Sequence, residues 1–472
     1  MNRNKELIRN ILIFGLGTFG SKLIQFLLIP LYSIYLSTTD YSVSDTLTST
    51  ISLITPLLTI GITDGVLRFT IGQVAHRKSI LKFSMLVCVC GTAILCAFIP
   101  LFNNLTEMFG SYGYLIPLLY FTSSIKTMLA QYCKAIEKNI TYALDGIISS
   151  LTLTTGSILL IGHFHMGVMG YILANIISRT VSIMYFVVLC KVPSTLHHAK
   201  IDRELTKELV AYSLPLMPNN LSWWIIQMSD RYMLIFFCGA ALNGLYSMAY
   251  KIPSIFNLIV SIFISAFGIT AMKECDSKTG NGKYDGSYFE RVYSQYLSLT
   301  FVAVVFIILL SRPIAFLILK KEFYNSWVYI PMLLCAYAVG NLQSFYGSIY
   351  GGIKKSKLVF ISTLSGAFTN ILLNLILIPY IKAYGAAIAT IVSYIVVYVI
   401  RLHNIKKYVE MKHFEKKILA SLAIMFIVSV LYILGNIYTI ILSVVMSMLM
   451  FVLYKQEISL LLRIGLNKLR RK

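Results

Sequence analysis

Long apolar segments recur along the whole chain and are separated by short polar loops. A segment of about 20 apolar residues is long enough for an α-helix to cross the hydrocarbon core of a bilayer. The pattern therefore predicts an all-α, polytopic membrane protein with about fourteen transmembrane helices. The predicted spans are 10–35, 42–66, 80–103, 113–135, 140–163, 166–190, 208–237, 240–272, 290–311, 325–352, 357–380, 384–402, 417–434 and 437–454. We expect the long run 240–272 to be tilted or broken near Pro253.

Composition supports the same class. Hydrophobic residues make up 57% of the 472 positions and charged residues only 13%. Soluble proteins average about 25% charged residues, so a soluble fold is excluded. The net charge of +22 could indicate nucleic-acid binding, and its placement along the chain decides that question.

Lys and Arg lie mostly on one side of the predicted membrane. If the N-terminus is cytoplasmic, the loops and termini on that side hold 32 of the 41 Lys and Arg residues, and the opposite loops hold four. Membrane proteins carry such an excess in their cytoplasmic loops. The pattern predicts cytoplasmic termini, an even number of spans and a bilayer environment, and it argues against a nucleic-acid partner.

The longest break in the first half of the apolar pattern is the polar loop 191–206. It divides the chain into a predicted N-terminal six-helix lobe, 1–190, and a predicted C-terminal six-helix lobe, 207–403. Two additional transmembrane helices follow at 417–454. The basic tail 455–472 reads either as a surface helix on anionic lipid or as a tail that only fixes the topology.

Five cations lie well inside predicted spans, away from the span ends: Lys22, Lys126, Arg179, Arg231 and Lys251. A cation in hydrocarbon costs about 2.5–3.5 kcal/mol on insertion scales, so such residues usually face a water-filled cavity or a partner. The first interpretation is a cavity that binds an anion. The second interpretation is that each cation pairs with a carboxylate that also lies inside a predicted span.

The costly carboxylates are candidates for coupling or gating. A membrane-embedded carboxylate can couple a proton or Na⁺ to transport, and it can also be a fixed partner of a neighbouring cation. Asp64 lies near Arg68 at a cytoplasmic helix end, and Asp230 is adjacent to Arg231. The candidates for coupling or gating are the carboxylates Asp45, Asp64, Asp145 and Asp230, together with Arg68.

Motifs of catalysis or cofactor binding give no support for an enzyme. The sequence has no nucleophile–base pair, Walker loop or HExxH motif, and its cysteines lack CxxC metal spacing. Gly15-Leu-Gly-Thr-Phe-Gly20 matches GxGxxG, but it lies in a predicted span without a preceding strand. We therefore expect a transporter without catalytic residues, cofactor or metal.

Several segments resemble a known family. Asp40-Tyr-Ser-Val-Ser-Asp-Thr-Leu and the run Leu57 to Phe69 resemble the first two-span unit of bacterial oligosaccharide flippases, although Ser42 stands where that family usually has Gly. These flippases are the polysaccharide-transport branch of the multidrug/oligosaccharidyl-lipid/polysaccharide (MOP) exporter superfamily. Further matches are Tyr212-Ser-Leu-Pro-Leu-Met-Pro-Asn-Asn-Leu-Ser-Trp-Trp224, Ser229-Asp-Arg-Tyr232, Asn243-Gly-Leu-Tyr-Ser-Met-Ala-Tyr-Lys251, the run Asn370 to Pro379 and Tyr384-Gly-Ala-Ala-Ile-Ala389.

The resemblance implies two helical bundles around a cavity (a MATE-like fold) and transport by alternating access. It implies an undecaprenyl-diphosphate-linked oligosaccharide as substrate, flipped from the cytoplasmic to the outer leaflet of the bacterial inner membrane for surface polysaccharides such as O-antigen or capsule. Polysaccharide polymerase and glycosyltransferases are the pathway partners that follow from this. A cation-coupled multidrug exporter and a non-transporting scaffold of an assembly complex remain alternatives.

A sugar needs wide, polar and aromatic walls. Aromatic and amide side chains in the predicted spans of the second half could supply such walls, and packing in the helix core is the alternative for each. The glycan-facing candidates are Tyr246, Tyr250, Tyr346, Asn341 and Gln343.

Overall fold

The computed structural model describes residues 20–72, 76–197, 199–274, 284–353, 355–460 and 463. Helices occupy nearly all of these ranges, and the described residues divide into two compact units. Unit 1 contains the described residues up to Ser247 together with Leu319–Phe323. Unit 2 contains Met248–Ile318 and the described residues from Tyr324 onward.

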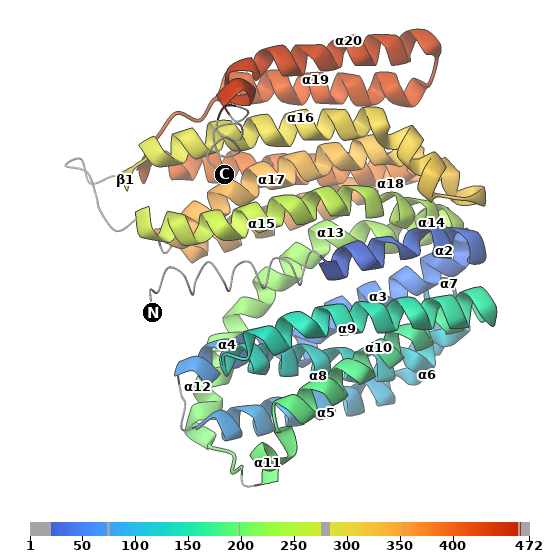
Figure 1. Cartoon of the computed structure of the whole chain (residues 1–472), viewed down its shortest axis with the longest axis vertical. Helices are drawn as coiled ribbons and strands as arrows, with labels where there is room; N and C mark the ends of the chain where they lie inside the picture. The colour runs from blue at the N-terminus through green and yellow to red at the C-terminus, as the bar shows by residue number, and fades with distance from the viewer. Residues whose placement is uncertain are drawn as a thin grey trace. The chain divides into compact units, whose positions relative to one another are not determined.

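Unit 1 is built from helices that follow the predicted spans closely (Figure 1). Residues 20–26 are helical, and a turn separates them from α2. The helices of this part are α2 (Leu28–Tyr35), α3 (Thr38–Leu58), α4 (Ile62–Gly72), α5 (Arg77–Ala97), α6 (Ile99–Asn104), α7 (Thr106–Phe109), η2 (Gly110–Leu115), α8 (Ile116–Ala135), α9 (Asn139–Ser157), the π-helical η3 (Ile158–His163), α10 (Gly167–Leu189), α11 (Val192–His197), α12 (Arg203–Ser213), η4 (Leu214–Leu216), α13 (Met217–Cys238) and α14 (Ala240–Ala249).

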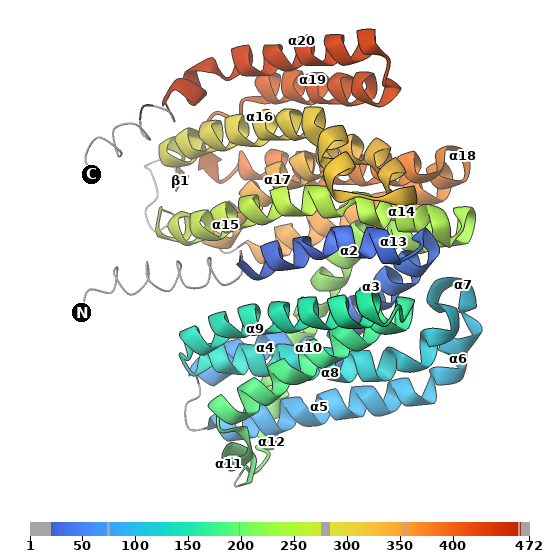
Figure 2. The ribbon, with the colours of Figure 1, turned by 45° about the vertical axis from the view of Figure 1, so that its right-hand side comes forward.

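Unit 2 also consists of long helices. They are α15 (Lys251–Glu274), α16 (Ser287–Ile318), η5 (Lys321–Tyr329, of which the first three residues belong to unit 1), α17 (Ile330–Gly352), α18 (Ser356–Ile405), α19 (Glu415–Leu434) and α20 (Ile437–Leu453). Two short strands, β1 (Tyr284–Asp285) and β2 (Val409–Glu410), pair in parallel. The helices α19 and α20 lie side by side and pack against α16 in both ribbon views (Figures 1 and 2).

Local sequence signals explain where several helices start and bend. At the start of α3, the Asp40 N–H donates to Ser37 Oγ at 3.1 Å and the Asp40 carboxylate accepts from the Ser37 N–H at 3.3 Å, which is a capping box. Pro56 lies inside α3, and the chain bends by 56° between α3 and α4. Gly61 stands in this bend at φ +66°, where its missing Cβ avoids the Ser213 carbonyl oxygen.

Breaks in the later helices also follow the prediction. The helix turns at Tyr250 between α14 and α15, close to the break expected near Pro253. The helix α18 changes direction at Ile381 and Lys382, which have non-helical backbone angles. This break separates the predicted spans 357–380 and 384–402. Within the described ranges, eight helices are long and apolar enough to cross a membrane, or up to nine if α3 and α4 form one bent span. The number fourteen therefore stays a prediction.

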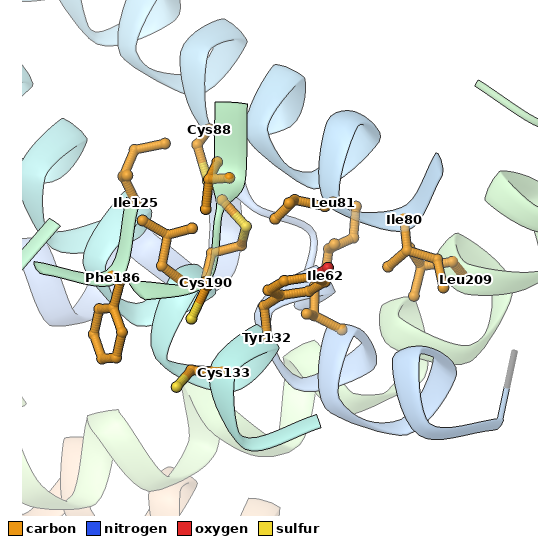
Figure 3. Packing of buried hydrophobic residues seen from close by; sticks show 14 of the residues in the cluster. Ile62, Ile80, Leu81, Cys88, Ile125, Tyr132, Cys133, Phe186, Cys190 and Leu209 are labelled. Atoms are coloured by element: carbon orange, nitrogen blue, oxygen red, sulfur yellow. The ribbon is translucent and has the colours of Figure 1, made fainter. Parts of the chain in front are cut away.

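The core of unit 1 is apolar. Figure 3 shows one cluster, in which Ile62, Leu81, Ile125, Tyr132 and Phe186 from α4, α5, α8 and α10 pack together. A second cluster joins α3 to α8 and α10. These clusters hold the helices that carry the polar side chains described below.

The core of unit 2 is rich in aromatic side chains. Phe267 stacks on Phe345 with ring centroids 4.3 Å apart, and Tyr293 lies 4.6 Å from the same ring. The two units are defined by packing between residues, and they do not test the predicted division into lobes. The lobes 1–190 and 207–403 and the additional helices at 417–454 therefore stay predictions. Residues 1–19 of the first lobe and most of the tail 455–472 lie outside the described residues.

Candidate functional site

A polar pocket lies within unit 1, between the helical segment 20–26, α8 and α9. Its volume is about 280 Å³. Its lining is mostly polar, although the helices around it are apolar on their outer faces. The polar and charged side chains on its wall are Ser21, Gln25, Lys126, Thr127, Gln131, Lys134, Tyr142, Asp145, Ser149 and Ser150.

Lys126 of α8 is the central charge of this pocket. Its ammonium donates to Ser149 Oγ at 3.0 Å and lies 3.8 Å from the Asp145 carboxylate, both on α9. The Lys126 side chain is 25% exposed, whereas the Asp145 side chain is 6% exposed. The lysine therefore still presents its charge to the pocket, and its carboxylate partner, which also lines the pocket, is almost fully buried.

Side chains of α10 hold these groups in place. Ser182 Oγ donates a hydrogen bond to the Asp145 carboxylate. Ser178 Oγ donates to the Ser149 carbonyl at 2.6 Å. The pocket is thus supported by a second layer of hydrogen bonds, which fixes the direction of its charged groups.

Lys22 and Arg179 lie in the same region. The Lys22 side chain is exposed next to the pocket residue Ser21, and Arg179 donates to the Leu119 carbonyl at 3.1 Å. Arg179 thereby meets α8, the helix that carries Lys126. Lys22, Lys126 and Arg179, three of the five cations predicted inside spans, therefore lie in this part of unit 1. Lys251 is half-buried at the start of α15, in unit 2.

Arg231 is engaged differently. Its guanidinium forms a buried ion pair with Asp45 of α3 and donates to Ser49 Oγ at 3.1 Å. The neighbouring Asp230 is also buried and accepts a hydrogen bond from the Tyr246 hydroxyl at 2.9 Å. For Arg231 and Asp45, the structure matches the interpretation of internal pairing.

Asp64 and Arg68 lie at the exposed face of α4. Asp64 accepts from the Asn220 amide at 3.0 Å, and the Arg68 guanidinium lies 5.3 Å from the centroid of the Tyr212 ring. These contacts join the predicted cytoplasmic end of α4 to α13 through Asn220 and to α12 through Tyr212. A gating role for either residue stays a prediction.

The predicted glycan-facing side chains are buried. Tyr250 packs edge-on against Tyr337 with centroids 6.0 Å apart, and Tyr346 hydrogen-bonds to His413 Nδ1 at 3.1 Å. Gln343 accepts from Arg401, and the Asn341 carbonyl accepts from Tyr296 at 3.0 Å. All these contacts lie inside unit 2, and Tyr246 is buried in unit 1. Contact with a glycan stays a prediction for all five candidates.

Arg401 is a buried cation near the end of the predicted span 384–402, and the sequence did not mark it as a candidate. It is 1% exposed and donates to Ser362 Oγ at 3.0 Å, to Thr363 Oγ1 at 3.1 Å and to the Gln343 carbonyl at 2.8 Å. It therefore joins α17 to both halves of α18. The sequence signal for this buried cluster was the presence of polar residues within apolar runs, namely Ser362, Thr363 and Gln343.

Solved structures of membrane transporters share this fold. The lipid II flippase MurJ in an inward closed conformation matches with a TM-score of 0.67 and 16% identity, over 94% of this chain and 98% of that one. An inward-facing multidrug resistance MATE family transporter of the MOP superfamily matches with a TM-score of 0.66 and 15% identity, over 82% and 95%. A MOP superfamily transporter from Pyrococcus furiosus matches with a TM-score of 0.56 and 14% identity, over 84% and 95%.

The described helices therefore have the fold of these solved transporters, with a polar pocket inside unit 1. A family model described as polysaccharide biosynthesis protein matches residues 7–268, and the chain belongs to that family. No curated protein matches the chain. The all-α, MATE-like fold and the resemblance to the polysaccharide branch are thereby confirmed.

Proposed function

We propose that this protein flips undecaprenyl-diphosphate-linked oligosaccharide units from the cytoplasmic to the outer leaflet of the bacterial inner membrane, with both of its termini in the cytoplasm. The observation that carries the proposal is the Lys126 pocket. A diphosphate cannot cross hydrocarbon unsolvated, and lysine ammonium groups form strong charge-assisted hydrogen bonds with phosphate oxygens. Membership of the polysaccharide biosynthesis family supports a glycan-bearing lipid as the substrate.

The proposed mechanism is alternating access. The head group enters from the cytoplasmic leaflet and contacts Lys126 first, with Lys22 and Arg179 adding positive charge nearby. The polyprenyl tail stays in lipid while the protein changes conformation. The protein acts as a transporter and not as an enzyme, and polymerase and glycosyltransferases of the pathway would use or supply the lipid-linked units.

The direct test is flipping of a lipid-linked oligosaccharide in proteoliposomes. Lys126→Gln should lower the rate at least about tenfold, because a buried charged contact to a ligand is worth more than 1.4 kcal/mol. The matched control is Lys200→Gln, since Lys200 is an exposed lysine outside the Lys126 pocket. Unchanged flipping by Lys126→Gln, with normal folding, would contradict the proposed site.

Export of a cationic drug is the second candidate, because the pocket also carries the Asp145 carboxylate and MATE transporters share the fold. Efflux of fluorescent cations from cells that express the protein tests it. Under the first proposal, efflux stays at background while flipping depends on Lys126. Efflux that is lost in Asp145→Asn would favour the drug exporter instead.

A further inference from the structure

The pocket of unit 1 holds a carboxylate in the place where an anionic substrate would bind. Of the lining residues, Lys126 and Lys134 are positive and Asp145 is negative, so the lining carries a net charge of only +1. An aspartate that repels a diphosphate lowers the affinity of the pocket. A pocket that served only to bind an anion tightly would not contain it.

The position of Asp145 is fixed by its surroundings. Ser182 of α10 donates to the Asp145 carboxylate, and the Asp145 side chain is 6% exposed. The Lys126 ammonium lies 3.8 Å away and also donates to Ser149 Oγ at 3.0 Å. Asp145 therefore has its own support from α10 and would keep its place while the ammonium takes a second partner.

The ammonium has room for that second partner. It carries three donors, and the Lys126 side chain is 25% exposed to the pocket. An anion that contacts Lys126 from the pocket would lie a few ångströms from the Asp145 carboxylate. Two negative charges would then share one cation, which weakens the binding of the anion.

Resting on the proposed function, we infer that Asp145 is a positioning residue that competes with the diphosphate of the substrate for the Lys126 ammonium. The competition sets the affinity low enough for release. A carrier has to bind its substrate and then let it go, so an affinity that is too high slows turnover. Asp145 also supplies a partner for Lys126 when the pocket holds no substrate, which avoids an unpaired buried charge.

The binding test uses the full-length protein in nanodiscs and inorganic pyrophosphate as the probe, measured by calorimetry. Asp145→Asn should tighten binding at least about tenfold, which corresponds to about 1.4 kcal/mol. Lys200→Gln removes a charge outside the pocket, so its dissociation constant should stay within about threefold of the wild-type value. Lys126→Gln, alone or combined with Asp145→Asn, should abolish binding.

The transport test separates affinity from turnover. In proteoliposomes with lipid-linked oligosaccharide, Asp145→Asn should lower both the half-saturating concentration and the maximal rate. Asp145→Glu, which restores the charge, should return both toward the wild-type values. A residue that only stabilised the fold would not move the two quantities in this linked way.

The outcomes distinguish the inference from the function on which it rests. If Asp145→Asn folds normally but binds pyrophosphate no more tightly than wild type, competition by Asp145 is wrong, whatever Lys126 does. If Lys126→Gln still binds pyrophosphate like wild type, the proposed site itself fails.

A converse variant covers the case in which Asp145→Asn does not fold. Ser149→Asp places a second carboxylate next to Lys126 and should weaken pyrophosphate binding at least about tenfold, corresponding to about 1.4 kcal/mol. Ser149→Asn adds a similar side chain without the charge and is the control. Equal binding by these two variants would overturn the inference.

Discussion

Asp45 of α3 and Arg231 of α13 form a buried ion pair although 186 residues separate them in the chain. Two further polar contacts join α3 to α13 and to α14. Trp224 Nε1 donates to the Ser49 carbonyl at 3.1 Å, and the Asn243 amide donates to Ser42 Oγ at 2.8 Å. Polar side chains therefore join α13 and the start of α14 to α3 within unit 1, whereas α3 meets α8 and α10 through apolar ones.

The first prediction concerns this ion pair. Asp45→Asn or Arg231→Gln leaves one charge buried without its partner, and each change should lower the free energy of unfolding by about 3–5 kcal/mol. The double variant Asp45→Asn/Arg231→Gln leaves no charge and should cost less than either single change. Thermal unfolding in detergent measures all three. Additive losses in the double variant would contradict the pairing.

A second prediction concerns the closest approach along the same contact. Gly244 of α14 lies against the backbone of Thr38, and a Cβ at Gly244 would stand 1.9 Å from the Thr38 carbonyl oxygen. Gly244→Ala should lower the free energy of unfolding by about 3 kcal/mol or more, because backbone cannot move aside as a flexible side chain can. At Gly20 a Cβ would meet nothing within 4 Å, so Gly20→Ala is the control. Equal unfolding temperatures for the two variants would show that the two helices can separate at no cost.

A third prediction tests alternating access. Cysteines at Ser42 and Asn243, joined by a short thiol cross-linker, should stop flipping if α14 has to move away from α3 during transport. The same double-cysteine protein without the cross-linker should transport normally. Native Cys335 with Ser429→Cys is the control, because the Cys335 thiol lies 3.1 Å from the Ser429 hydroxyl inside unit 2. Full flipping by the cross-linked Ser42–Asn243 protein would mean that this contact stays closed throughout the cycle.

The fourth prediction concerns pH. Burial lowers the pKa of His413 below its ordinary value of 6.5, and the Lys406 ammonium lowers it further, while Glu415 and Glu290 act in the opposite direction. The unfolded chain therefore binds this proton at a higher pH than the folded chain does. The stability that His413 contributes is present above about pH 6.5 and is lost as the pH falls through its folded pKa.

Comparison of two histidine variants measures this effect. Between pH 7.5 and 5, the unfolding temperature of the wild type should fall more than that of His413→Gln. His403→Gln should behave like the wild type, since His403 is an exposed histidine on α18. In variants that keep Cys335 and have the other cysteines replaced by serine, reaction of this buried thiol with a fluorophore reports unfolding of unit 2. Parallel pH curves for wild type and His413→Gln would refute the assignment.

Much of the fold follows from local properties of the sequence. Apolar runs predicted where helices lie, because a segment in hydrocarbon has to satisfy its own backbone hydrogen bonds. The break expected near Pro253 falls at Tyr250, whereas the bend after Pro56 interrupts a segment that was predicted as the single span 42–66. Lys126 and Asp145 lie inside predicted apolar spans, so the sequence also indicated that both charges are costly to place in a membrane.

Only the tertiary structure decided how these polar residues combine. Asp145 pairs with Lys126, and Asp45 pairs with Arg231, whereas Asp230 accepts from Tyr246. Arg401 lies near the end of a predicted span and was not among the candidates, yet it is buried and donates hydrogen bonds to three polar residues of α17 and α18. The physical reason is that partner choice depends on which helix faces meet, and those meetings join positions up to 186 residues apart. Hydropathy along the chain sets the elements, and only packing between them sets which charge neutralises which.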